Sequence, residues 1–126
     1  MAIVRATEAP RFDLPGGFHF FGLLAPSRGS TELCTWRLEV EPGVHSEPHH
    51  LDHEEVFVIL EGSLTITIDG QAFDLGAGDA LAVPARSLLS VANRTSAKAS
   101  ALVCIRAGFR ATMASGEEIN TPPWAV

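Results

Sequence analysis

The chain has 126 residues, which suits one domain, and 46% of them are hydrophobic, too many for a disordered chain. Its formal net charge at pH 7 is -6, from fifteen acidic and nine basic residues. The basic residues are scattered singly, so no positive stripe is available for nucleic-acid phosphates or for an anionic membrane surface. We therefore expect neither partner.

Proline and glycine are frequent in residues 1–30, and we expect an N-terminal arm there with one strand over residues 18–24. The opening stretch MAIVRATEAPR lacks the apolar core of a signal peptide, and no run approaches the length of a membrane span. A cytoplasmic location is the expectation. In that reducing compartment Cys34 and Cys104 are expected to be small buried hydrophobes and not a disulfide.

From residue 32 the pattern changes to period two. Apolar and polar residues alternate over residues 32–40, which predicts a half-buried strand. Further strands are expected over residues 55–60, 64–68, 71–75, 80–83, 88–92 and 101–106. Asp69-Gly70 between two of these runs is a strong hairpin signal. Short strands at close spacing, without a convincing helical period, predict an all-β sandwich or closed barrel.

This pattern divides a single domain into three parts. The arm covers residues 1–30, the barrel residues 31–110, and a C-terminal tail residues 111–126. Pro122 and Pro123 exclude a central strand from the end of the tail. We expect the tail to pack on the barrel with Trp124 as its anchor.

Two groups of residues resemble the two sequence motifs of the cupin superfamily, in the family's order and at its spacings. They are Gly43, His49, Glu55 and Gly62 for the first motif and Gly78, Pro84 and Asn93 for the second. The resemblance covers about residues 33–108. Within the superfamily, the chain is similar to the small single-domain cupins. It implies a double-stranded β-helix, the jelly-roll barrel of that family. Because the family spans many chemistries, the resemblance by itself does not imply a reaction.

The metal-binding part of the motifs is degenerate. The family's usual site uses three His and one Glu, and only His49 and Glu55 keep those residue types here. Leu51 stands at the second His of the first motif, and Leu89 at the His of the second. Arg86 replaces the motif glycine that follows Pro84.

A metal site is nevertheless predicted from a dense cluster, since four of the five histidines lie within residues 45–53, among carboxylates. Imidazole and carboxylate are the usual ligands of iron, zinc, manganese and nickel. We expect His49, His53 and Glu55 to bind a divalent ion, with Glu47 as a possible fourth ligand. The spacing of Glu47, His49 and His53 also looks like a variant arrangement in manganese cupins related to ureidoglycine aminohydrolase.

Two functions stay open at this point. The first is a metal-dependent enzyme that acts on a small organic molecule in the barrel by dioxygenation, isomerisation or hydrolysis. Leu51, Leu89 and Phe57 would then line an apolar pocket. The second is a metal-free binding or interaction module, which the two leucines favour because an apolar lining ligates nothing. Exposed barrel edges and the aromatic arm also predict a homodimer.

Overall fold

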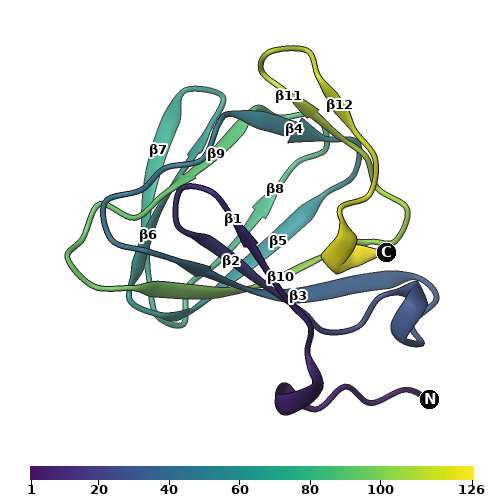
Figure 1. Cartoon of the computed structure of the whole chain (residues 1–126). Coiled ribbons are helices and arrows are strands. Elements are labelled where there is room, and N and C mark those ends of the chain that lie inside the picture. Colours follow the sequence, from purple (N-terminus) through teal and green to yellow (C-terminus); the bar gives the residue numbers. More distant parts are fainter.

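The computed structural model describes all residues from 1 to 126, and its regular secondary structure is almost entirely antiparallel β-strand (Figure 1). One sheet has the order β1-β2-β3-β10-β5-β8, and the other has the order β12-β11-β4-β9-β6-β7. The first sheet contains β1 (Arg11–Leu14), β2 (Phe18–Gly22), β3 (Leu33–Val40), β10 (Ala99–Arg106), β5 (Glu55–Glu61) and β8 (Ala80–Val83). The second contains β12 (Glu118–Ile119), β11 (Ala111–Met113), β4 (His49–Leu51), β9 (Leu89–Ala92), β6 (Ser63–Ile68) and β7 (Gln71–Gly76). The all-β jelly-roll prediction is confirmed.

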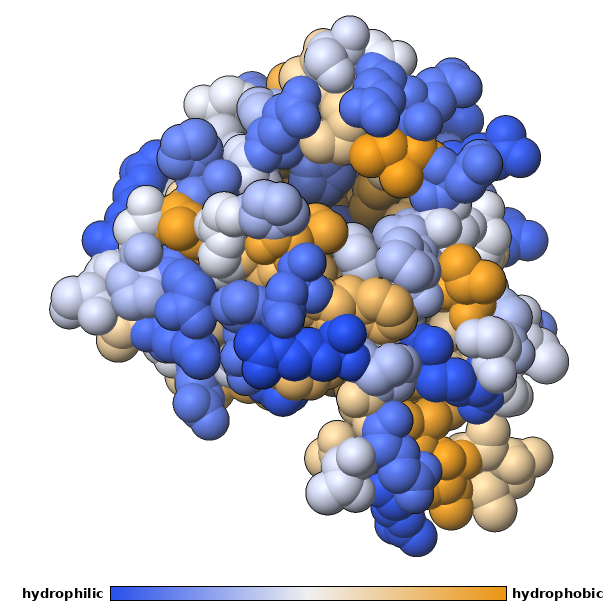
Figure 2. Space-filling model, viewed as in Figure 1, coloured by the Kyte–Doolittle hydropathy of each residue, from blue (hydrophilic) through white to orange (hydrophobic).

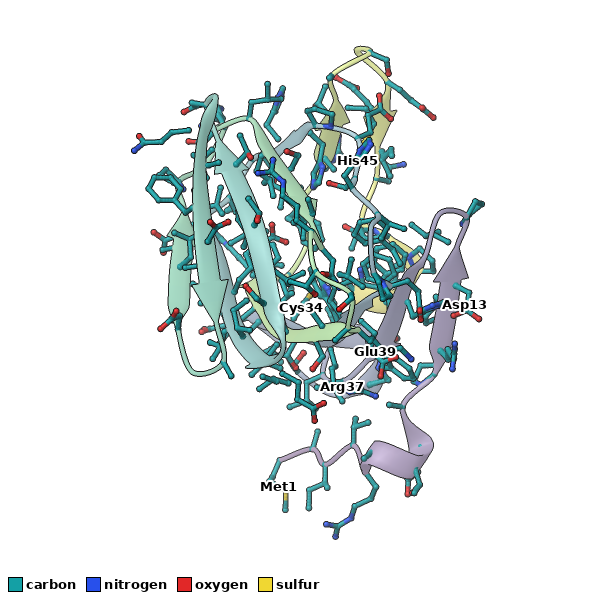
Figure 3. The ribbon with its side chains drawn as sticks, turned by 90° about the vertical axis from the view of Figure 1, so that its left-hand side faces the viewer. Met1, Asp13, Cys34, Arg37, Glu39 and His45 are labelled. Atoms are coloured by element: carbon teal, nitrogen blue, oxygen red, sulfur yellow. The ribbon has the colours of Figure 1, made fainter.

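The centre of the first sheet follows the alternation of β3. Trp36 and Leu38 point inward and are buried, while Arg37 between them is on the outer face. There the Arg37 guanidinium lies 4.0 Å from the centroid of the Phe21 ring and contacts Glu39. Figure 3 shows Arg37 and Glu39 together on this face. The register with β10 places Val103 opposite Trp36, so the inward residues of both strands form one apolar layer.

Two turns show why glycine stands where it does. Asp69 and Gly70 both have positive φ angles, 48° and 84°, and they join β6 to β7 as a tight hairpin. Gly62 joins β5 to β6 with a φ of 71°, and a Cβ there would lie 2.9 Å from the carbonyl oxygen of Lys98. The motif glycine is therefore required both by its backbone conformation and by a close neighbour.

The two ends of the chain contain more strand than the sequence predicts. Residues 1–30 hold a complete hairpin, β1–β2, where only one strand over residues 18–24 is expected. Residues 111–126 include β11 and β12, and β11 pairs with β4. The three strands not expected from the sequence, β1, β11 and β12, are two to four residues long. They carry too few alternations for a period to be recognised, and they form because of their tertiary pairing.

The tail contacts the first sheet through the short 3-10 helix η3 (Pro123–Ala125). Trp124 lies against the rings of Phe12, Phe20 and Trp36. Arg28, in the 3-10 helix η2 (Pro26–Arg28), donates to the Trp124 carbonyl. A third 3-10 turn, η1 (Ala6–Glu8), belongs to the arm. Both cysteines are free thiols, and none of the helices is long enough to cross a membrane.

Candidate functional site

A cavity of about 410 Å³ lies between the two sheets, within the size range of small-molecule sites. Fourteen of its twenty-one lining residues are hydrophobic, which favours a ligand with a large apolar part. Its aromatic walls come from the strands, the loop before β11 and the tail: Phe18, Phe20, Trp36, Phe57, Phe109 and Trp124. Figure 2 shows the face of the molecule seen in Figure 1, where hydrophobic side chains surround a recess between hydrophilic ones.

The polar lining of the cavity comes mainly from one segment that enters β4. His45, Ser46, Glu47 and His49 all line the cavity, and Glu55 at the start of β5 completes the set. Alternation explains three of them, because odd-numbered residues of the segment share a face. An isolated bridge to Ala92 places His45 beside β9, and Figure 3 shows His45 far from the outer-face residues Arg37 and Glu39.

His49 is held in one orientation. Its Nδ1 lies 2.9 Å from the carbonyl oxygen of Glu47, and since a carbonyl only accepts, Nδ1 carries the hydrogen. Burial lowers the pKa of the His49 ring below its ordinary 6.5, while contact with the Glu47 carbonyl and side chain opposes that shift. At neutral pH the ring is therefore uncharged, and Nε2 carries a free lone pair.

Glu55 is the most unusual polar group of the site. Only 4% of the residue is exposed, and its Oε1 atom has no hydrogen-bond partner. Burial raises the pKa of this carboxyl to about 8. Glu55 is thus an undissociated acid at neutral pH in an apolar cavity, which is the state a proton donor needs.

The predicted metal ligands are only partly brought together. His49, Glu55 and Glu47 line the cavity, but His53 does not, and its Nδ1 contacts the Asp52 carboxylate at 2.8 Å. No group of three or more His, Cys, Asp or Glu side chains lies close enough together to hold a metal ion. As these donors lie, they do not fit the four-ligand centre that the family motif implies.

Of the residues expected to line an apolar pocket, Leu51 and Phe57 lie along this cavity. Leu89 does not line it, because this residue packs into the core at 1% exposure opposite His49. Sequence reasoning missed the tail as a wall of the site: Met113, Ile119, Pro122 and Trp124 all contribute. The only available signal was Trp124 itself, an aromatic residue in a stretch that could not be a central strand.

Comparison with known proteins agrees with this architecture. Residues 36–105 match the cupin domain family. A Mycobacterium tuberculosis protein named beta-D-galactosidase Rv1717 is 34% identical over 108 residues, covering 83% of this chain and 93% of that protein.

Two solved structures show the same fold. The polyketide cyclase RemF of Streptomyces resistomycificus superposes with a TM-score of 0.74 at 21% identity, covering 84% of this chain and 79% of that one. A cupin-superfamily sugar phosphate isomerase of Silicibacter pomeroyi gives a TM-score of 0.71 at 22% identity, covering 95% and 92%. The family match over residues 36–105, together with the relative from Mycobacterium tuberculosis, shows that this chain belongs to the cupin family.

Proposed function

We propose that the cavity binds a small, uncharged glycoside and that the Glu55 carboxyl is the acid that cleaves its glycosidic bond. The observation that carries this proposal is the buried carboxyl of Glu55, without a partner, in the wall of an aromatic cavity. The relative named beta-D-galactosidase supports a β-galactoside as the substrate class. Among the reactions expected from the sequence, this proposal selects hydrolysis and names the glycosidic bond as the bond that is cleaved.

The acid step requires a protonated group next to the leaving oxygen. Glu55 would give its proton to the glycosidic oxygen as the bond between that oxygen and the anomeric carbon breaks, so the aglycone leaves as an alcohol. Its apolar surroundings keep the carboxyl protonated until this step.

Glycoside hydrolysis also needs a second carboxylate, and Glu47 lines the same cavity. Unlike Glu55, it is exposed to solvent. Glu47 would accept a proton from a water molecule whose hydroxyl adds to the anomeric carbon. Solvent then carries a proton back to Glu55, which balances the reaction. Two carboxyl groups in contrasting environments suit the two opposite roles.

The test compares two substrates that differ in their need for acid. Phenyl β-D-galactoside has a poor leaving group, and 4-nitrophenyl β-D-galactoside has a good one. We expect Glu55→Gln to lower kcat/KM for the phenyl substrate by about 10²- to 10⁴-fold and for the nitrophenyl substrate by much less. Glu47→Gln should impair both substrates alike.

The matched control is Glu54→Gln, which changes the exposed neighbouring carboxylate and should leave both rates unchanged. Full activity of Glu55→Gln on both substrates would show that another group supplies the proton. Failure of the wild-type protein to hydrolyse either galactoside would refute the proposed function.

The divalent metal expected from the sequence is the alternative to be excluded, although His49, Glu47 and Glu55 share the cavity without lying close enough together to hold an ion. It is tested by elemental analysis of untagged protein, purified without chelator, beside a His49→Ala variant. Under the acid mechanism, hydrolysis survives dialysis against a chelator. One metal ion per chain that disappears in His49→Ala, together with loss of activity on chelation, would favour the metal-dependent alternative.

A further inference from the structure

Two buried polar atoms stand out in this protein because they have no hydrogen-bond partner. They are Glu55 Oε1 and Trp124 Nε1, and both residues line the same cavity. Leaving a buried donor or acceptor unpaired is unfavourable, so such atoms are rare in folded proteins. Two of them in one cavity indicate that a bound molecule supplies the missing partners.

The Trp124 indole is held in place by its surroundings. Its ring stacks on Phe20 with centroids 3.7 Å apart, and it meets Trp36 nearly edge-on at 6.4 Å. Arg28 donates to the Trp124 carbonyl, and the Cys34 thiol lies 3.2 Å from the carbonyl of Ala125. The indole cannot turn toward solvent without breaking these contacts. A hydrogen-bond partner for Nε1 must therefore bind beside the ring in its present position.

The neighbours of the ring determine where that partner can be. Phe12, Phe20 and Trp36 surround the indole, and none of these side chains offers a strong acceptor. Trp124 also lines the cavity, where a ligand can reach it. An indole N–H only donates, so the missing partner is an acceptor atom of the ligand.

The charge of the lining limits the ligand further. No Arg or Lys is among the residues that form the cavity, and its acidic members are Glu47 and Glu55. A phosphate or carboxylate would enter a largely apolar space that has two acidic residues and no Arg or Lys to balance its charge, which is costly. The acceptor is therefore an oxygen of an uncharged group, such as a hydroxyl, an ether or a carbonyl.

We infer that Trp124 is a specificity-determining residue, whose Nε1–H binds an oxygen atom of an uncharged ligand inside the barrel. This inference rests on the ligand cavity of the proposed function but not on the reaction. It assigns a binding role to the C-terminal tail, which lies outside both cupin motifs. Glu55, the other unpaired group, contacts the same ligand.

The test uses two small probes of nearly equal shape, acetophenone and α-methylstyrene, which differ in having a carbonyl oxygen or a methylene group. Their dissociation constants are measured by calorimetry or ligand-detected NMR. In Trp124→Phe the ring is kept and the N–H is lost. We expect the preference for acetophenone over α-methylstyrene to fall by about tenfold relative to wild type, while affinity for α-methylstyrene stays nearly constant.

Phe12→Leu is the matched control, because Phe12 packs on the Trp124 ring but does not line the cavity, so this change disturbs the packing of the indole without removing its N–H and should keep the preference. Constant affinity for α-methylstyrene also shows that each variant is folded. An unchanged preference in Trp124→Phe, or an equal loss of preference in Phe12→Leu, would overturn the inference. So would a lack of binding of both probes to the wild-type protein.

Benzoate, the charged counterpart, should bind the wild-type protein at least about tenfold more weakly than acetophenone. Equal or tighter binding of benzoate would contradict an uncharged ligand. None of these probes has a glycosidic bond, so the result is independent of the hydrolysis assay. Hydrolysis of galactosides without any Trp124 effect on probe binding would refute this inference alone.

Discussion

The indole ring of Trp124 stacks on the phenyl ring of Phe20 at a centroid distance of 3.7 Å and an interplanar angle of 12°. This contact joins the last residues of the chain to its second strand, and both residues line the cavity. The two ends of the protein therefore build one wall of the site together, outside the part of the chain that carries the cupin motifs.

Replacing Trp124 by alanine should destabilise the whole barrel. The residue is only 9% exposed, and truncating a buried Trp costs about 3–5 kcal/mol. Urea denaturation followed by circular dichroism measures this loss in the free energy of unfolding. Trp124→Phe, which keeps a ring on Phe20, should lose much less. Equal stability of the alanine variant would show that the tail does not pack as described.

Glu55 should make the stability of the protein fall with rising pH. Its pKa is about 8 in the folded protein against an ordinary 4.5, so between these values the folded state holds a proton that the unfolded state has lost. The unfolded state thus binds fewer protons, and stability decreases through this window by up to about 1.4 kcal/mol per pH unit, then levels off.

Glu55→Gln removes this dependence, so its stability relative to wild type should rise with pH. Unfolding in urea at several pH values from about 5 to about 8 gives the difference directly. Glu61→Gln alters an exposed residue of the same strand and serves as the control. A pH-independent difference between Glu55→Gln and wild type would mean that the carboxyl is paired or hydrated.

His49 should affect the pH dependence of stability in the opposite sense to Glu55. Because burial lowers its pKa below 6.5 in the folded protein, the unfolded state takes up a proton first as the pH falls. The stabilising contribution of the neutral ring is present above pH 6.5 and is lost on acidification. NMR titration of the ring protons should give a value below 6.5, and a value above it would contradict the described burial.

Asn93 should be a structural residue and not a ligand-binding one. It is 1% exposed, its Nδ2 donates to the carbonyls of Val40 and Ala97, and its Oδ1 accepts from the backbone and hydroxyl of Thr95. Asn93→Ala leaves several of these groups unpaired and should cost about 1–3 kcal/mol or more. Denaturation beside Arg94→Ala, an exposed neighbour, measures this cost. A difference below about 0.5 kcal/mol would refute the role.

The sequence by itself was sufficient to predict the barrel fold. Alternation over residues 32–40 and the Asp69-Gly70 turn follow from local chemistry, because a half-buried strand needs period two and a tight turn needs positive φ. The resemblance to the two cupin motifs implied the family's barrel. Each of these features was confirmed in the fold, and Arg37 faces outward as the alternation requires. A homodimer and a cytoplasmic location stay predictions.

Only the tertiary structure decided which polar residues meet. His53 follows Leu51 with the same parity, but β4 ends at Leu51, so its side chain reaches Asp52 and not the cavity. Period-two reasoning holds only while the chain stays extended, and here it fails within two residues of the strand end.

The tail shows the same limit over a longer range. The sequence predicts Trp124 as an anchor of the tail, but nothing in residues 111–126 signals that it would stack on Phe20 or line a cavity that β4 also lines. Such contacts depend on the pairing of β11 with β4 and on the position at which η3 packs against the first sheet. Local sequence patterns encode strand faces and turns, whereas contacts between residues a hundred positions apart are set by how the whole barrel packs.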